Sequence, residues 1–142
     1  MKKLFMAVSI MSLGFIGCKK DQVNNKSPKD YIVGTWDFEK VKVQEFEDNE
    51  LISESTLYPQ EGSILDLKGS GYYYYHFKLE EDWINLTGRY KIDGTRFVFI
   101  DLDNPEDNVE MEIKDIDESN LILQLHEVSN NQENKNTFYF TK

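Results

Sequence analysis

The stretch WINLTGRYKIDGTRFVFI, residues 83–100, contains two runs of alternating apolar and polar residues joined by an Asp-Gly pair. Alternation with a period of two is typical of a half-buried β-strand, and Asp-Gly is a strong signal for a two-residue hairpin loop. We therefore predict a type I′ turn centred on Asp93 and Gly94, which places Tyr90 opposite Phe97. The apolar side chains of both strands then lie on one face of the hairpin.

The same alternation recurs along most of the chain on both sides of this hairpin, and no segment keeps helical spacing for three turns. Residues 51–58 alternate weakly and are predicted to form a poor edge strand or a loop. Between Phe38 and Val41 the alternation slips by one residue, which a β-bulge near Glu39 would explain. The apolar residues of the alternating segments are Trp36, Phe38, Val41, Val43, Leu65, Leu67, Tyr73, Tyr75, Phe77, Leu79, Ile84, Leu86, Tyr90, Ile92, Val109, Met111, Ile113, Leu121, Leu123, Leu125, Phe138 and Phe140.

Short strands about ten residues apart, each with one apolar face, predict an all-β fold. We expect an up-and-down antiparallel β-barrel of about eight strands, because closing the sheet removes its exposed edges. A Greek-key sandwich is the alternative. Ser27 as N-cap, Pro28 at the first helical position and Asp30 at the third predict a short helical turn through Val33, before the first strand.

The N-terminal segment 1–17 has the features of a secretory signal peptide, with Lys2 and Lys3 followed by an apolar run that is too short to span a membrane. The sequence Phe15-Ile16-Gly17-Cys18 resembles the lipobox of bacterial lipoproteins. The resemblance implies that Cys18 is the lipidated N-terminus of a mature protein that is held at a membrane without crossing it. A simple signal peptide with an incidental cysteine is the alternative.

The remaining chain divides into a lipidated flexible tether, residues 18–30, and a domain, residues 31–142. Cys18 is the only cysteine, so the domain has no disulfide and no thiolate metal ligand. The net charge of −10 argues against nucleic acid as a partner, since nucleic acids require a basic face. We expect a monomer in the cell envelope, anchored in the outer membrane and facing the periplasm or the cell surface.

Several segments of the domain carry a further resemblance. The stretch IVGTWDFEKV with its Gly-x-Trp motif, the spacing from Trp83 through Gly88 to Ile92, and the ending TFYFTK are similar to the lipocalin-like domain of lipoproteins from Gram-negative bacteria. The resemblance covers residues 31–142 and implies a barrel with Trp36 packed in its core, closing one end. An arginine covers this tryptophan in lipocalins proper, whereas the last strands here offer only Lys135 and Lys142.

Two classes of function fit these observations. In the first, the barrel binds a small apolar or amphipathic ligand inside, since an eight-stranded barrel is just wide enough to hold one. Alternatively, the inward-facing aromatic side chains simply fill the interior. In the second, a non-enzymatic envelope module contacts protein or glycan through exposed aromatics. The candidate interior residues are Trp36, Tyr73, Tyr75, Phe77, Tyr90, Phe97, Phe99 and Phe138. The candidate surface patch is Tyr72, Tyr74, His76 and Trp83.

Catalytic chemistry has little support in the sequence. The strand faces show no cluster of ionisable residues, and no nucleophile, base and acid have a recognisable spacing. The two histidines, His76 and His126, both fall on the outward phase of their strands, where a surface position is favoured over a metal site. We therefore expect no enzyme activity, no metal and no cofactor.

Overall fold

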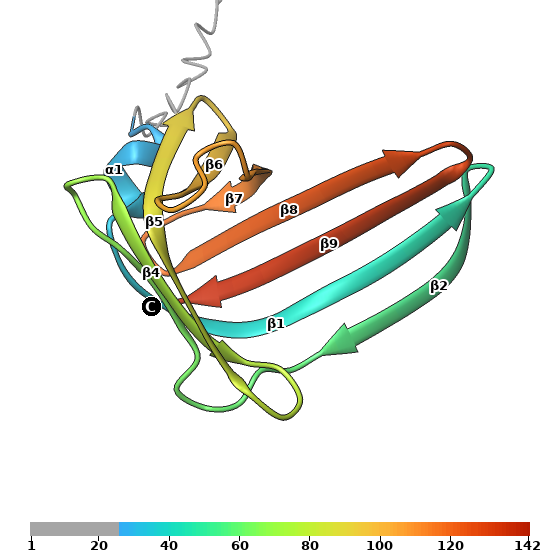
Figure 1. The fold of residues 1–142 in the computed structure, drawn as a ribbon, viewed down its shortest axis with the longest axis horizontal. Helices are drawn as coiled ribbons and strands as arrows, with labels where there is room; N and C mark the ends of the chain where they lie inside the picture. Colours follow the sequence, from blue (N-terminus) through green and yellow to red (C-terminus); the bar gives the residue numbers. More distant parts are fainter. Residues whose placement is uncertain (1–25) are drawn as a thin grey trace, which may run out of the picture.

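The computed structural model describes residues 26–142 (Figure 1). The predicted signal peptide, Cys18 and most of the tether lie outside the described residues, so these predictions stay predictions. Within the described part, no helix is long and apolar enough to cross a membrane.

A short helix, α1 (Pro28–Ile32), precedes the first strand as predicted, although it ends one residue earlier. The backbone N–H of Ser27 donates to the Asp30 carboxylate at 2.6 Å, which ties the helix start together. Pro28 occupies the first turn, where its missing N–H removes no helical hydrogen bond.

Within residues 26–142, nine strands follow the helix and form one antiparallel sheet. Eight of them, β1 and β3 to β9, close into a barrel through the pairing of β1 with both β3 and β9, and β2 lies outside on β1. The predicted up-and-down barrel is therefore confirmed, and the sandwich is not. The strands are β1 (Gly34–Glu47), β2 (Glu50–Leu57), β3 (Ile64–Leu67), β4 (Tyr72–Lys78), β5 (Trp83–Asp93), β6 (Arg96–Asp101), β7 (Asn108–Ile116), β8 (Asn120–Ser129) and β9 (Gln132–Thr141).

The long strand β1 belongs to two parts of the sheet. Its first residues, 34–37, pair with β3 in the barrel wall, whereas residues 41–47 pair with β2. Its other edge pairs with β9 from residue 37 to residue 47. We call the resulting four-stranded part, made of β2, the second half of β1, β9 and β8, the extension; in Figure 1 these strands run out to one side of the barrel. Residues 51–58 were expected to form a poor edge strand or a loop, and all of them except Tyr58 belong to the edge strand β2.

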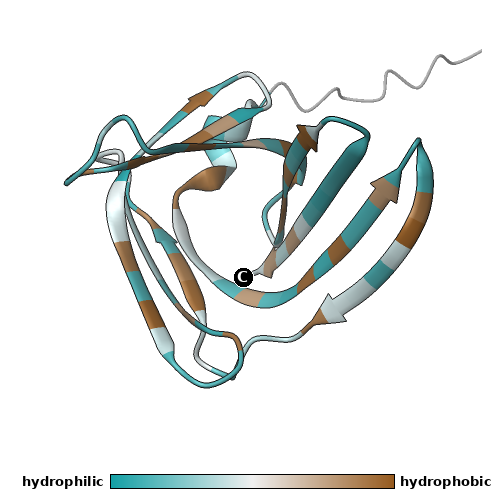
Figure 2. Cartoon of the chain, turned by 45° about the vertical axis from the view of Figure 1, so that its right-hand side comes forward, coloured by the Kyte–Doolittle hydropathy of each residue, from teal (hydrophilic) through white to brown (hydrophobic). Residues whose placement is uncertain are grey.

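The bulge predicted near Glu39 is confirmed. Phe38 pairs with Phe140 and Lys40 with Tyr139, so Glu39 is the extra residue. The extra residue shifts the alternation of β1 by one position, so that the apolar side chains before and after Glu39 both point into the barrel. Figure 2 shows the same alternation of hydrophobic and hydrophilic residues along several strands.

The predicted register of the central hairpin is wrong by two residues. Asp93 pairs with Arg96 and Tyr90 with Phe99, so the loop residues are Gly94 and Thr95. Gly94 has a φ of 60°, while Thr95 does not have a positive φ. A glycine at the first loop position is the type II′ arrangement, which spares the β-branched Thr95 the positive φ that it would need in a type I′ turn. A shift of two residues keeps every side chain on its predicted face.

Trp36 seals one end of the barrel, as the family resemblance implies. Its side chain is fully buried, and its indole N–H donates to the carbonyl of Ile32 at 2.8 Å. The Lys142 ammonium lies 3.9 Å from the centre of the Trp36 ring and also donates to the carbonyls of Tyr31 and Val33. Of the two lysines that the last strands offer, Lys142 therefore covers this tryptophan. We call this end, where Ile32, Trp36, Leu65, Leu67 and Leu121 are at most 2% exposed, the closed end.

Candidate ligand-binding interior

Aromatic rings from β1, β4 and β9 converge inside the barrel around Phe38. Its ring centre lies 5.8 Å from that of Tyr75, 6.1 Å from that of Phe77 and 5.1 Å from that of Phe140. Phe138 joins them at 6.1 Å. Strand periodicity directs these side chains inward, because residues two apart in a strand lie on the same face.

A second aromatic group joins β4 to β5 and β6. Tyr73 contacts Phe99 at 4.8 Å, Phe99 contacts Phe97 at 4.6 Å, and Tyr90 stacks on Phe97 at 5.6 Å. Tyr73 also covers its cross-strand partner Gly88, where an added Cβ would lie 2.6 Å from the tyrosine ring. A glycine is required here because the backbone carbonyl of Ile100 and the Tyr73 ring leave no room for a side chain.

All eight residues predicted for the interior lie on the inner face, but they differ in accessibility. Trp36, Tyr73, Phe97 and Phe99 are buried, whereas the other four are partly buried. The buried members thus act as core, and ligand contact stays a prediction. The partly buried members are Tyr75, Phe77, Tyr90 and Phe138.

The end of the barrel opposite Trp36 is flared. Strand β5 pairs with β6 only from Gly88 onward, and β8 pairs with β7 only up to Gln124. The first half of β5 and the second half of β8 therefore lack these neighbours among the described strands. The sheet is split at this end, because β5 and β6, and β7 and β8, no longer pair there.

Inner-face apolar side chains remain exposed at this flared end. Ile84, Leu86 and Val109 are 41%, 43% and 41% exposed, although they pair directly with the interior residues Phe77, Tyr75 and Phe99. Cross-strand partners share a face, so these three side chains face inward. We define the open end as nine inner-face residues, each at least partly exposed: Val43, Tyr75, Phe77, Ile84, Leu86, Val109, Leu125, Asn136 and Phe138. Ile84, Leu86 and Val109 were not predicted as site residues, although their strand phase carried the signal.

Two polar atoms of the open end are shielded from solvent and have no hydrogen-bond partner. They are the hydroxyl oxygen of Tyr75 and the side-chain oxygen of Asn136. Burial raises the pKa of Tyr75 far above its usual value, so this group is a neutral hydroxyl. Asn136 lies between Val43 and Leu125 in the sheet. Asn136 was not predicted from the sequence. The available signal was its position two residues before Phe138, which places a polar residue on the apolar face of the strand.

The inner-phase charges near the open end are negative. Asp101 pairs with Gly88, and Glu45 follows Val43 on the inner phase of β1. Burial and, second, the Asp101 charge raise the pKa of Tyr73. None of the residues that define the open end is a lysine, arginine or histidine.

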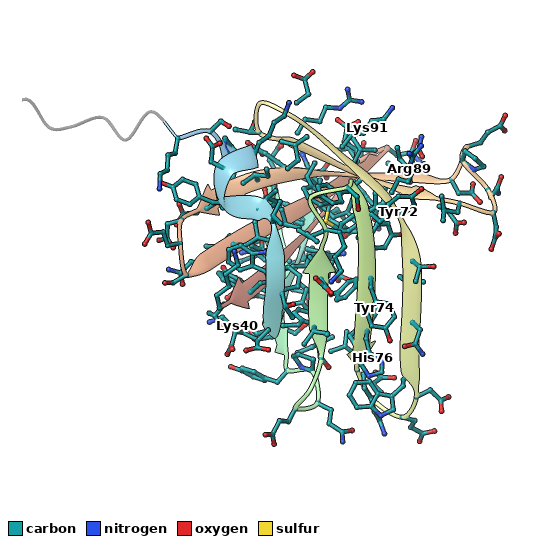
Figure 3. The ribbon with its side chains drawn as sticks, turned by 90° about the vertical axis from the view of Figure 1, so that its left-hand side faces the viewer. Lys40, Tyr72, Tyr74, His76, Arg89 and Lys91 are labelled. Atoms are coloured by element: carbon teal, nitrogen blue, oxygen red, sulfur yellow. The ribbon has the colours of Figure 1, made fainter. Side chains whose placement is uncertain are left out.

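The candidate surface patch lies on the outer face of β4 and β5, where Figure 3 shows Tyr72, Tyr74 and His76 along one strand. His76 stacks on Trp83 at 4.2 Å and on Tyr74 at 6.0 Å. The side-chain oxygen of Asn85 accepts a hydrogen bond from Tyr74 and lies 2.5 Å from Nδ1 of His76. The faces of these rings are therefore stacked against one another.

Tyr72 is separate from that stack, because the Arg89 guanidinium lies over its ring at 5.2 Å. The four patch residues thus lie on one face of the sheet, but their rings contact one another or Arg89. Nothing in this arrangement points to a particular partner. The other histidine, His126, is paired with Glu133 at 2.7 Å on the outer face of the extension.

Comparisons with known proteins give similarities to solved structures only. No protein-family model matches the chain, and no curated protein matches it. The bovine lipocalin allergen Bos d 2 is 13% identical with a TM-score of 0.48, over 81% of this chain and 75% of that one. Bovine odorant-binding protein with a selenium-containing odorant is 17% identical with a TM-score of 0.46, over 82% and 73%. A deswapped triple mutant of bovine odorant-binding protein is 17% identical with a TM-score of 0.45, over 79% and 74%. Likeness at this level says nothing about what this chain binds.

Proposed function

We propose that this barrel is a non-enzymatic binding protein that holds one small apolar or amphipathic molecule at its open end. The observation that carries the proposal is the Tyr75 side chain, whose shielded hydroxyl has no partner and whose neighbour Leu86 is 43% exposed on the inner face. Buried polar groups are normally hydrogen-bonded, so an interior filled only for stability would pair the hydroxyl.

The exposed apolar side chains supply a driving force for binding. Full burial of a leucine or isoleucine side chain is worth roughly 1.5–3 kcal/mol. Covering the exposed parts of Ile84, Leu86 and Val109 would therefore contribute on the order of 2–3 kcal/mol to ligand affinity. The aromatic rings around Phe38 add a rigid apolar wall beneath the ligand.

We further propose that the protein acts at a membrane surface as a lipoprotein of the outer membrane, anchored through Cys18. Several acyl chains give stable anchoring, whereas one chain is marginal. The test is expression of the full chain and of Cys18→Ala in a Gram-negative host with a labelled fatty acid. The unaltered chain should carry label in the outer-membrane fraction. Label retained by Cys18→Ala would contradict this part of the proposal.

Binding is tested with residues 26–142, which contain the domain, purified without lipid and titrated with the neutral dye Nile red, whose fluorescence rises in apolar surroundings. We expect saturable binding that Leu86→Gln weakens about three- to fivefold, as removal of roughly 0.7–1 kcal/mol of apolar contact requires. The matched control is Leu51→Gln, because Leu51 is 50% exposed but lies on the outer face of β2. Equal loss in both variants, or no saturable binding, would contradict the proposal.

A further inference from the structure

We infer that the ligand at this open end is uncharged and carries an oxygen that accepts a hydrogen bond from the Tyr75 hydroxyl. Long-chain alcohols and ketones belong to this class, whereas fatty acids do not. The inference rests on the proposed function, because it names the chemistry of the molecule that the open end would hold.

The position of the Tyr75 ring fixes where the hydroxyl lies. The ring is held by Phe77 at 4.4 Å and by Phe140 at 6.1 Å, and its cross-strand neighbours are Leu65 and Leu86. All of these neighbours are apolar, so none can accept the hydroxyl proton. A shielded hydroxyl without an acceptor is unfavourable, and a ligand oxygen at this point would satisfy it.

The second shielded atom, the Asn136 side-chain oxygen, needs a donor rather than an acceptor. It comes from β9, and its strand neighbours on the inner face are Val43, Leu125 and Phe138. A hydroxyl group both donates and accepts, so an alcohol is the simplest ligand group able to satisfy either atom. A ketone would satisfy Tyr75 alone, which makes the alcohol the preferred member of the class.

The charge distribution disfavours an anionic ligand. Binding a carboxylate in a poorly hydrated site requires a cationic partner, and the residues of the open end supply none. The nearby inner-phase charges, Asp101 and Glu45, are acidic, and the whole chain carries a net charge of −10. The Lys142 ammonium lies over Trp36 at the closed end, where backbone carbonyls already occupy it.

The test compares dodecanol with dodecanoate, which have the same chain length, as competitors of Nile red at about pH 8, where the carboxylate is ionised. We expect dodecanol to bind the domain at least about tenfold more tightly than dodecanoate. Tyr75→Phe should weaken dodecanol binding about tenfold, the effect of losing one hydrogen bond. The same variant should leave the affinity for dodecane unchanged. Tyr139→Phe, on the outer face of β9, is the matched control and should bind dodecanol as the unaltered domain does.

Tighter or equal binding of dodecanoate would overturn the uncharged class. An unchanged dodecanol affinity in Tyr75→Phe would overturn the assignment of the hydroxyl. Either result would still leave Nile red bound at the open end, so the proposed function would survive it. Failure of Nile red to bind saturably would instead overturn the proposed function together with this inference.

Discussion

Replacing Tyr75 by phenylalanine should stabilise the ligand-free domain, although most core substitutions destabilise a protein. The change removes a shielded hydroxyl that has no hydrogen-bond partner and keeps the ring against Phe38 and Phe77. An unsatisfied buried polar group costs about 1–3 kcal/mol, so we expect Tyr75→Phe to raise the free energy of unfolding by about 1–2 kcal/mol. For a domain of this size, that corresponds to a rise in melting temperature of roughly 5 °C.

The matched control makes the same chemical change where the hydroxyl has a partner. The Tyr90 hydroxyl donates to the carbonyl of Lys68 at 2.7 Å, so Tyr90→Phe should lower the free energy of unfolding by about 0.5–1.5 kcal/mol. Urea titrations of delipidated, ligand-free domain, followed by circular dichroism, measure both changes. Equal destabilisation by the two substitutions would refute the reasoning, because it would mean that the Tyr75 hydroxyl is satisfied in solution.

Three further predictions concern stability. Gly88→Ala should cost about 1–3 kcal/mol in thermal unfolding because its Cβ would lie 2.2 Å from a backbone carbonyl oxygen, whereas Gly69→Ala, which meets only an ordinary contact at 3.9 Å, should be near neutral. Lys142→Met should lose about 1–2 kcal/mol by removing two hydrogen bonds at the closed end, and Lys91→Met on the exposed face of β5 should lose almost nothing; equal urea midpoints would contradict this. The pKa of Glu133 is lowered from 4.5 by its hydrogen bond to a lysine and by nearby cations, so its stabilising effect is present above that value and is lost as the pH falls through the lowered folded-state pKa. Glu133→Gln should therefore destabilise the domain slightly at neutral pH and not at all below the folded-state pKa of Glu133, where its carboxyl is protonated. A difference in stability between the two proteins that grows on acidification would contradict this role of Glu133.

The inward side of each strand followed from the sequence because side-chain direction in a strand is a local property with a period of two. Trp36, Tyr73 and Phe97 could therefore be assigned to the interior before any pairing was known. The short helix was equally local, since Ser27 and Asp30 lie within one turn. The bulge at Glu39 was visible as a slip in the same period.

The register of the central hairpin could not be derived in the same way. Gly94 has a positive φ in the structure, but a glycine can take either loop position, and the sequence does not state which. The pairing of Tyr90 with Phe99 was settled by the fit of the whole strand to its neighbours.

The features that carry the proposals depended on the tertiary structure. The long strand β1 is divided between β3 and β2, and its other edge pairs with β9, which is distant in the sequence. The flare that exposes Leu86 depends on where β5 stops pairing with β6 and β8 stops pairing with β7. Whether the Tyr75 hydroxyl is paired depends on rings from β1 and β9 that close around it. The sequence by itself determined the direction of each side chain, because that follows from local backbone geometry. Burial and hydrogen-bond partners were decided only by the closed barrel, because they require groups brought together from distant strands.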